Sequence, residues 1–148
     1  MGSELEFWPS AGMSPDSAAA DQKTVLFVDD DLVILEMRRL IFESLGYQVL
    51  TARSEKAALA LLRQHSIDVV VMDHQLPGTN GVETASRIRR IHPRVPIISS
   101  SGCSRLPEGL RRVIDGAVPK GEGPEALIEV LYRQLWESHR YPAIPAEM

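Results

Sequence analysis

Five short apolar runs alternate along the chain with segments whose apolar residues recur at helical spacing. The runs cover residues 24–28, 47–51, 69–72, 95–100 and 117–119. Runs of this length, rich in β-branched residues, are typical of strands in a buried parallel sheet. The intervening segments predict helices at residues 31–45, from 54 onward, and at 82–91, 107–114 and 125–138. The alternation predicts an α/β domain of three layers, with a five-stranded parallel sheet and five helices.

Local signals define the ends and inner faces of these elements. Asp31 and Ser54 stand where a side-chain oxygen can cap a helix. The helical spacing predicts inward-facing residues on the first helix (Ile34, Met37, Ile41, Leu45), the second (Ala58, Leu61, Leu62) and the last (Leu127, Leu131, Leu135). The fifth strand contains Pro119, and because proline lacks a ladder donor this strand should lie at a sheet edge.

The composition fits one soluble domain of 148 residues, 44% of them hydrophobic. A net charge of -4 gives no general attraction to nucleic acid or to an anionic membrane. No apolar run approaches the roughly 20 residues that a spanning helix needs, and the single cysteine, Cys103, fits a reducing cytoplasm. We therefore expect a cytoplasmic protein with a flexible leader (1–22), a folded domain (23–138) and a tail (139–148).

Polar residues whose side chains can react or bind ligands follow four of the predicted strands. They are Asp29, Asp30, Asp73, Ser101 and Lys120. Right-handed crossovers place the carboxyl ends of all parallel strands at one edge of the sheet, so these side chains should converge. The sequence thus predicts a cluster of three carboxylates, a hydroxyl and a lysine.

Such a cluster is equipped for phosphoryl transfer. Three carboxylates repel one another unless a cation neutralises them, and oxygen ligation by few protein groups suits Mg²⁺. A lysine and a hydroxyl beside the metal can contact further phosphoryl oxygens. An aspartate carboxylate can itself be the nucleophile, and in this chemistry positioning and charge neutralisation carry most of the catalysis.

The motifs around these residues resemble the receiver domain of two-component response regulators. They read Val-Asp29-Asp30-Asp31, Met-Asp73-x-x-Leu-Pro77-Gly-x-x-Gly81, Pro-Ile-Ile-x-x-Ser101-Gly102 and Pro-Lys120. Together they span about residues 23–138. The resemblance implies a doubly wound sheet of strand order 2-1-3-4-5.

The resemblance also implies a role for each residue. Asp73 would accept a phosphoryl group from the phosphohistidine of a histidine kinase or phosphotransfer protein. Asp30 and Asp73 would ligate Mg²⁺ directly, together with the Gln75 main-chain carbonyl, and Asp29 would do so directly or through water. Ser101 would hydrogen-bond the phosphoryl group and Lys120 would pair with it.

We accordingly expect a stand-alone phosphoacceptor that lacks an effector domain and passes its signal to a downstream protein partner. It would not be an enzyme, since it would catalyse only its own phosphorylation and dephosphorylation.

Three departures from the family pattern affect its output. Ala117 stands where an aromatic residue is usual, and Gly121 replaces the usual proline after the lysine. The segment between Ser101 and Lys120 is short, so we expect the fourth helix to be stunted or irregular. In the family that these motifs resemble, the hydroxyl at the position of Ser101 moves toward the phosphoryl group, and an aromatic ring fills the space that it leaves. Because Ala117 cannot do so, we expect the Gly102–Leu110 segment to respond instead.

Two other functions compete with this interpretation. Asp29-x-Asp31-x-Val33 resembles the opening motif of haloacid-dehalogenase-type phosphatases, with Asp29 as nucleophile and Asp31 as acid/base. No Asp pair follows Lys120 to hold a metal, however, and Asp73 would be left unexplained. The other alternative is a receiver-shaped interaction module that is never phosphorylated.

Several charged residues have simpler interpretations. Asp31 is expected to be a helix cap, and His74 either to tune access to the acyl phosphate or to be exposed. Four arginines (Arg87, Arg89, Arg90, Arg94) are expected to form a solvated helix end rather than a basic contact patch.

Overall fold

The computed structural model describes residues 22–102 and 105–137. These residues contain one five-stranded parallel sheet. Its strands are β1 (Thr24–Val28), β2 (Gln48–Ala52), β3 (Val69–Met72), β4 (Ile97–Ser101) and β5 (Gly116–Pro119). They lie in the order β2-β1-β3-β4-β5, and every neighbouring pair is parallel. The predicted strand order and the edge position of the fifth strand are confirmed.

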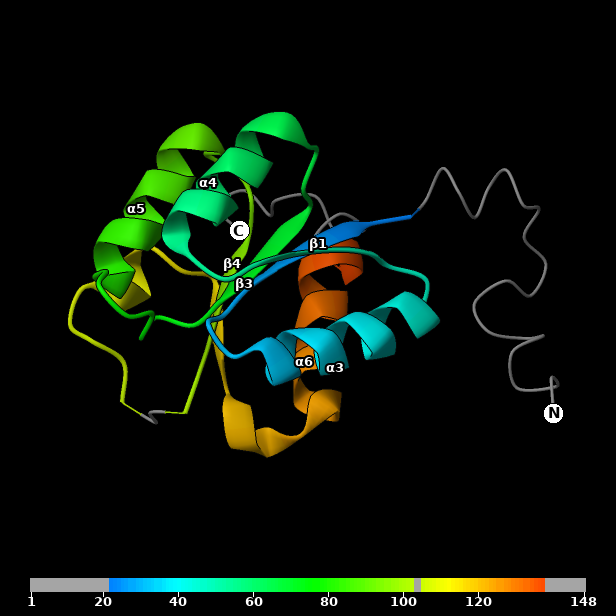
Figure 1. Ribbon diagram of the computed structural model, residues 1–148. Helices are drawn as coiled ribbons and strands as arrows, with labels where there is room; N and C mark the ends of the chain where they lie inside the picture. The colour runs from blue at the N-terminus through cyan, green and yellow to red at the C-terminus, as the bar shows by residue number, and fades with distance from the viewer. Residues whose placement is uncertain (1–21, 103–104, 138–148) are drawn as a thin grey trace, which may run out of the picture.

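Helices cover both faces of the sheet and complete the three layers (Figure 1). The helices α3 (Leu32–Ser44) and α6 (Pro124–Tyr132) lie on one side, and α4 (Glu55–Gln64) and α5 (Gly81–Ile91) lie on the other. Each face has its own apolar core, because successive residues of a strand point to opposite sides. Leu26 and Val28 of β1 pack with α4 and α5, whereas Val25 and Phe27 pack with α3 and α6.

The inner face of α3 differs from the prediction. Leu35 and Phe42 are the buried residues of this helix, whereas Met37, which the spacing places inward, is 55% exposed. Ile34, Ile41 and Leu45 are half-buried. The aromatic ring of Phe42 sets this rotation, since it packs between Phe27 and Tyr47 with ring centroids 5.2 and 5.4 Å away.

The predicted helix caps are present. Asp31 Oδ1 accepts hydrogen bonds from the Val33 and Ile34 amides, and Ser54 Oγ accepts one from the Ala57 amide. Asp31 is therefore a helix cap, as its position predicts. The inward positions of Leu127, Leu131 and Leu135 are also confirmed, the last on a π-helical turn (Arg133–Glu137) that continues α6.

In the described part of the fourth connection (residues 102 and 105–115) there is no α-helix. A 3-10 turn, η1 (Leu110–Arg112), stands where the sequence predicts a helix over residues 107–114, so the described residues hold four α-helices rather than five. Gly109, just before the turn, has a φ of 90°, which a right-handed helix does not allow. Leu110 is fully buried and fixes the turn against α5. A second 3-10 turn, η2 (Lys120–Glu122), follows β5.

Several sequence-based expectations lie outside the described residues. They concern the leader (1–22, except Gln22), the tail (139–148) and Cys103. In the part of the chain that the structure describes, no helix combines the length and the apolar character needed to cross a membrane.

Candidate functional site

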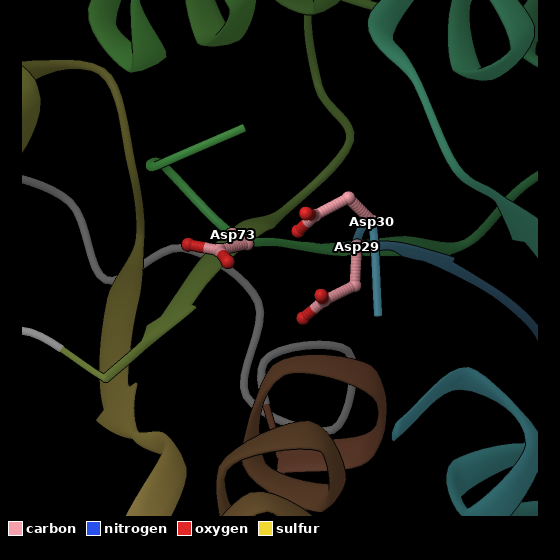
Figure 2. Close-up of side chains that lie close together, drawn as sticks. All are labelled: Asp29, Asp30 and Asp73. Atoms are coloured by element: carbon pink, nitrogen blue, oxygen red, sulfur yellow. The ribbon is translucent and has the colours of Figure 1, made fainter. Parts of the chain in front are cut away.

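Three carboxylates meet at the carboxyl end of the sheet. Asp29 and Asp30 follow β1, and Asp73 follows β3, the neighbouring strand. One oxygen from each lies within 4.8 Å of the others (Figure 2). Asp29 and Asp73 are buried, whereas Asp30 is exposed and forms the open side of the cluster.

Lys120 reaches this cluster from the end of β5. Its Nζ lies 2.9 Å from Asp29 Oδ2 and 2.9 Å from Asp73 Oδ2. Burial disfavours the charged form of Lys120, but its contacts with the two carboxylates outweigh burial and raise its pKa. The lysine is therefore a fixed positive charge between two buried acids.

Main-chain amides orient both buried carboxylates. Asp29 Oδ1 accepts a hydrogen bond from the Asp31 amide, and Asp73 Oδ1 accepts one from the Gln75 amide, each at 2.9 Å. These bonds fix the side chains while leaving the second oxygen of each toward Lys120.

The donor set suits a hard divalent cation. Asp29 Oδ2 is buried and accepts no hydrogen bond from the described residues. It forms an ion pair with Lys120. An acidic oxygen in this condition can accept a metal at little cost in lost hydrogen bonds. Three carboxylates that converge with one side exposed are ligands of the kind Mg²⁺ takes, with water completing its shell.

Ser101, the last residue of β4, lies beside the loop that follows Asp73. Its buried hydroxyl donates a hydrogen bond to Gln75 Oε1 at 2.6 Å. The family resemblance implies a role for the Gln75 main-chain carbonyl; the Gln75 side chain also ties the loop to β4.

His74 is buried, with 5% of its surface exposed, so the interpretation of an exposed side chain is wrong. Its Nδ1 lies 2.9 Å from Ser99 Oγ, and burial lowers the pKa of the imidazole. The residue is enclosed because α5 begins directly against it: a Cβ atom on Gly81 would lie 2.6 Å from His74 Cβ.

An open cavity of about 210 Å³ lies next to Ala117 on the same face of β4 and β5. Its lining comprises His74, Ser99, Ser101, Leu106, Arg111, Ala117, Val118 and Pro119. The short Ala117 side chain leaves this space beside the Ser101 hydroxyl unfilled.

Two of the four arginines after Asp73 are ion-paired; Arg87 is exposed and Arg89 is half-buried. Arg87 pairs with Glu55 at 2.7 Å and so connects α5 to α4. Arg89 pairs with Asp115 at 3.0 Å and donates to the Val113 carbonyl at 2.6 Å. These contacts have structural roles, and Arg90 and Arg94 are exposed.

Arg38 is a further charged residue near the site, and no motif in the sequence marks it. Its Nη2 donates to Ser100 Oγ at 2.6 Å, and its guanidinium carbon lies 5.6 Å from the Phe27 ring centroid. One sequence feature could have indicated Arg38: it lies between Leu35 and Phe42, the two buried residues of α3, where a charged residue is unusual.

Comparisons with known proteins agree on one family. The family model described as "Response regulator receiver domain" matches residues 25–132. The sensor kinase/phosphatase LuxN of Vibrio campbellii is 31% identical over 126 residues, which cover 84% of this chain and 15% of that protein. The chain spans less than two thirds of the length of the curated relatives it matches.

Two solved structures share the fold. A CheY-like response regulator receiver domain protein from Methanospirillum hungatei has a TM-score of 0.74 and 28% identity, covering 80% of this chain and 98% of that one. The response regulator TrrA from Thermotoga maritima, in complex with Mg²⁺ and BeF, has a TM-score of 0.72 and 28% identity, covering 77% and 100%.

Proposed function

The chain belongs to the response regulator receiver domain family, and from this premise we propose that Asp73 accepts a phosphoryl group from a phosphohistidine. The donor would be a histidine kinase or a phosphotransfer protein. One observation carries the proposal: Asp73 is a buried carboxylate held between an acidic pair and Lys120, at the carboxyl end of the central strand.

Each residue around Asp73 has a task in this reaction. The Gln75 amide holds one Asp73 oxygen, which orients the carboxylate for attack on phosphorus. The new O–P bond forms as the P–N bond to the donor imidazole breaks. Lys120 then pairs with phosphoryl oxygens. The Ser101 hydroxyl, which donates to the Gln75 side chain in the free protein, turns to donate to another phosphoryl oxygen.

A divalent cation completes the site. Asp29, Asp30, Asp73 and the Gln75 main-chain carbonyl would hold Mg²⁺, which when bound supplies positive charge against the transferring phosphoryl group. The chain's own contribution is the convergence of three carboxylates that otherwise repel one another.

The phosphodonor protein would dock on the exposed apolar side of α3. Leu32, Val33, Met37 and Leu40 are all more than half exposed, although they are large apolar residues. This helix begins two residues after Asp30, so its first turns lie beside the acidic cluster that the phosphodonor must reach. A groove of about 170 Å³ between α3 and the start of α6, with Lys120 in its wall, continues the same surface.

Labelling with acetyl phosphate tests the proposal. The parent protein should gain one phosphoryl group by intact mass, only with Mg²⁺ present, and peptide mapping should place it on Asp73. Asp73→Asn removes the nucleophile while keeping the size of the side chain, so labelling should be lost. Asp31→Asn is the matched control, because Asn also caps helices and labelling should persist. Stoichiometric labelling of Asp73→Asn would refute the assignment.

The contacts of Asp29 and Asp31 do not favour the phosphatase alternative. Asp29 has one oxygen on the Asp31 amide and the other on Lys120, and Asp31 serves α3 as its cap. Multiple turnover of a phosphomonoester that depends on Asp29 would nevertheless favour the phosphatase. Absence of any label on the parent protein would favour the unphosphorylated module.

We further propose that the receiver acts in the cytoplasm, without an attached effector, and signals to a downstream protein. The curated relatives carry their matching segment within longer proteins. The size of the protein detected in its own cells therefore tests this part separately from the chemistry at Asp73.

A further inference from the structure

Arg38 is a cation that the proposed reaction does not use, although it lies beside the acidic site. It projects from α3 to β4, where its Nη2 donates to Ser100 Oγ at 2.6 Å. Ser100 directly precedes Ser101, and Phe27, over which the guanidinium lies, is two residues before Asp29. Arg38 thus contacts β1 and β4, two of the four strands whose ends carry the reactive groups.

The guanidinium is largely withdrawn from water. Its Nη1 is buried and has no hydrogen-bond partner within residues 22–102 and 105–137. Burial lowers the pKa of Arg38, but the negative charges of Asp29 and Asp73 oppose this, and an arginine stays charged at neutral pH. Arg38 and Lys120 also line the same groove, and Lys120 contacts both Asp29 and Asp73.

Counting formal charges shows which state of the site Arg38 favours. In the free protein three carboxylates face Lys120 and Arg38, and a bound Mg²⁺ would turn the excess negative charge into excess positive charge. When Asp73 instead carries a dianionic phosphoryl group with Mg²⁺ bound, the formal positive and negative charges become equal in number. Without Arg38 the phosphorylated site would keep one uncompensated negative charge.

We propose that Arg38 is a positioning residue that biases the site toward its phosphorylated state. Its charge weakens Mg²⁺ binding to the free protein and stabilises the phosphoryl group once Asp73 has accepted it. The inference rests on the proposed function and adds a means of regulation: the metal is held firmly only together with the phosphoryl group.

Three variants separate charge from packing. Arg38→Met removes the charge and keeps a long side chain, whereas Arg38→Lys keeps the charge. Arg39→Met is the matched control, because Arg39 lies on the same helix, is partly exposed and pairs with Glu36 and Glu43 on the outer side. It changes the net charge of the protein equally, at a position away from the site.

Isothermal titration calorimetry measures two affinities for each variant: Mg²⁺ alone, and beryllofluoride, a phosphoryl mimic, at saturating Mg²⁺. For Arg38→Met we expect Mg²⁺ to bind about three- to tenfold more tightly and beryllofluoride about three- to tenfold more weakly. Arg38→Lys should stay nearer the parent in both affinities, and Arg39→Met should leave both unchanged.

Opposite shifts distinguish this role from a structural one. If Arg38 only supports the fold, its replacement weakens both ligands or neither, and either result overturns the inference. Ser100→Ala, which removes the hydrogen bond and keeps the charge, should preserve the Mg²⁺ affinity; if it copies Arg38→Met, the inference also fails. Should Arg38→Met not fold, Arg38→Gln takes its place. If the parent protein is labelled on Asp73 but the variants show no opposite shifts, the role of Arg38 is refuted and the proposed function still stands.

Discussion

At the scale of single residues, the loop after Asp73 is held by a close approach of two backbones. A Cβ atom on Gly81 would lie 2.6 Å from His74 Cβ and 2.7 Å from the His74 carbonyl oxygen. Only a glycine lets α5 begin this close to the chain. The contact fixes the peptide that leads to Gln75, whose amide holds Asp73 Oδ1. Gly81 thereby helps to orient Asp73, the proposed phosphoacceptor, without touching it.

Gly81→Ala should therefore destabilise the protein, by about 1–3 kcal/mol in the free energy of unfolding, because backbone atoms must move to admit the methyl group. Urea denaturation measures this. Gly121→Ala is the control: its added Cβ would meet nothing within 4 Å, so the change should be within about 0.5 kcal/mol. Equal stability of the two variants would show that the loop relaxes freely.

Residue-scale predictions from the sequence succeed where the interaction is local. The capping roles of Asp31 and Ser54 depend on amides two or three positions away. The surroundings of His74 and Arg38 depend instead on Ser99 and Ser100, which only the folded sheet brings near. No spacing along the chain encodes those contacts.

At the scale of elements, the apolar runs predict all five strands because a buried parallel strand needs little else. The fourth connection is the exception, since the helical spacing over residues 107–114 does not account for the backbone at Gly109. This connection is a 3-10 turn anchored by Leu110, and it borders the open cavity beside Ala117. A short turn with open space beside it can rearrange at lower cost than a packed α-helix.

Binding of beryllofluoride with Mg²⁺ should accordingly change hydrogen exchange in residues 105–112 and in the loop after Asp73. Residues 117–119 and α6 should change little, because Ala117 has no rotamer to switch. Asp73→Asn, which should not bind beryllofluoride, serves as the control. A dominant change in β5 and α6 would mean that the output face is coupled by another route.

At the scale of the whole molecule, topology assembles the site. Lys120 and Asp73 are 47 positions apart in sequence, yet their side chains are 2.9 Å apart. Parallel strands with right-handed crossovers bring their carboxyl ends to one edge, so the sequence is sufficient to predict which residues meet. It does not predict how they pair, because the shared contact of Lys120 with two buried acids depends on the register and burial of the finished sheet.

The most direct test of the central claim is a crystal structure of the protein grown with Mg²⁺ and beryllofluoride. Our account predicts beryllium bonded to an Asp73 carboxylate oxygen. It also predicts a metal ion among Asp29, Asp30 and Asp73, with Lys120 and Ser101 on the fluorides. Beryllofluoride attached to another residue, or a metal bound away from the three carboxylates while Asp73 stays free, would contradict the account.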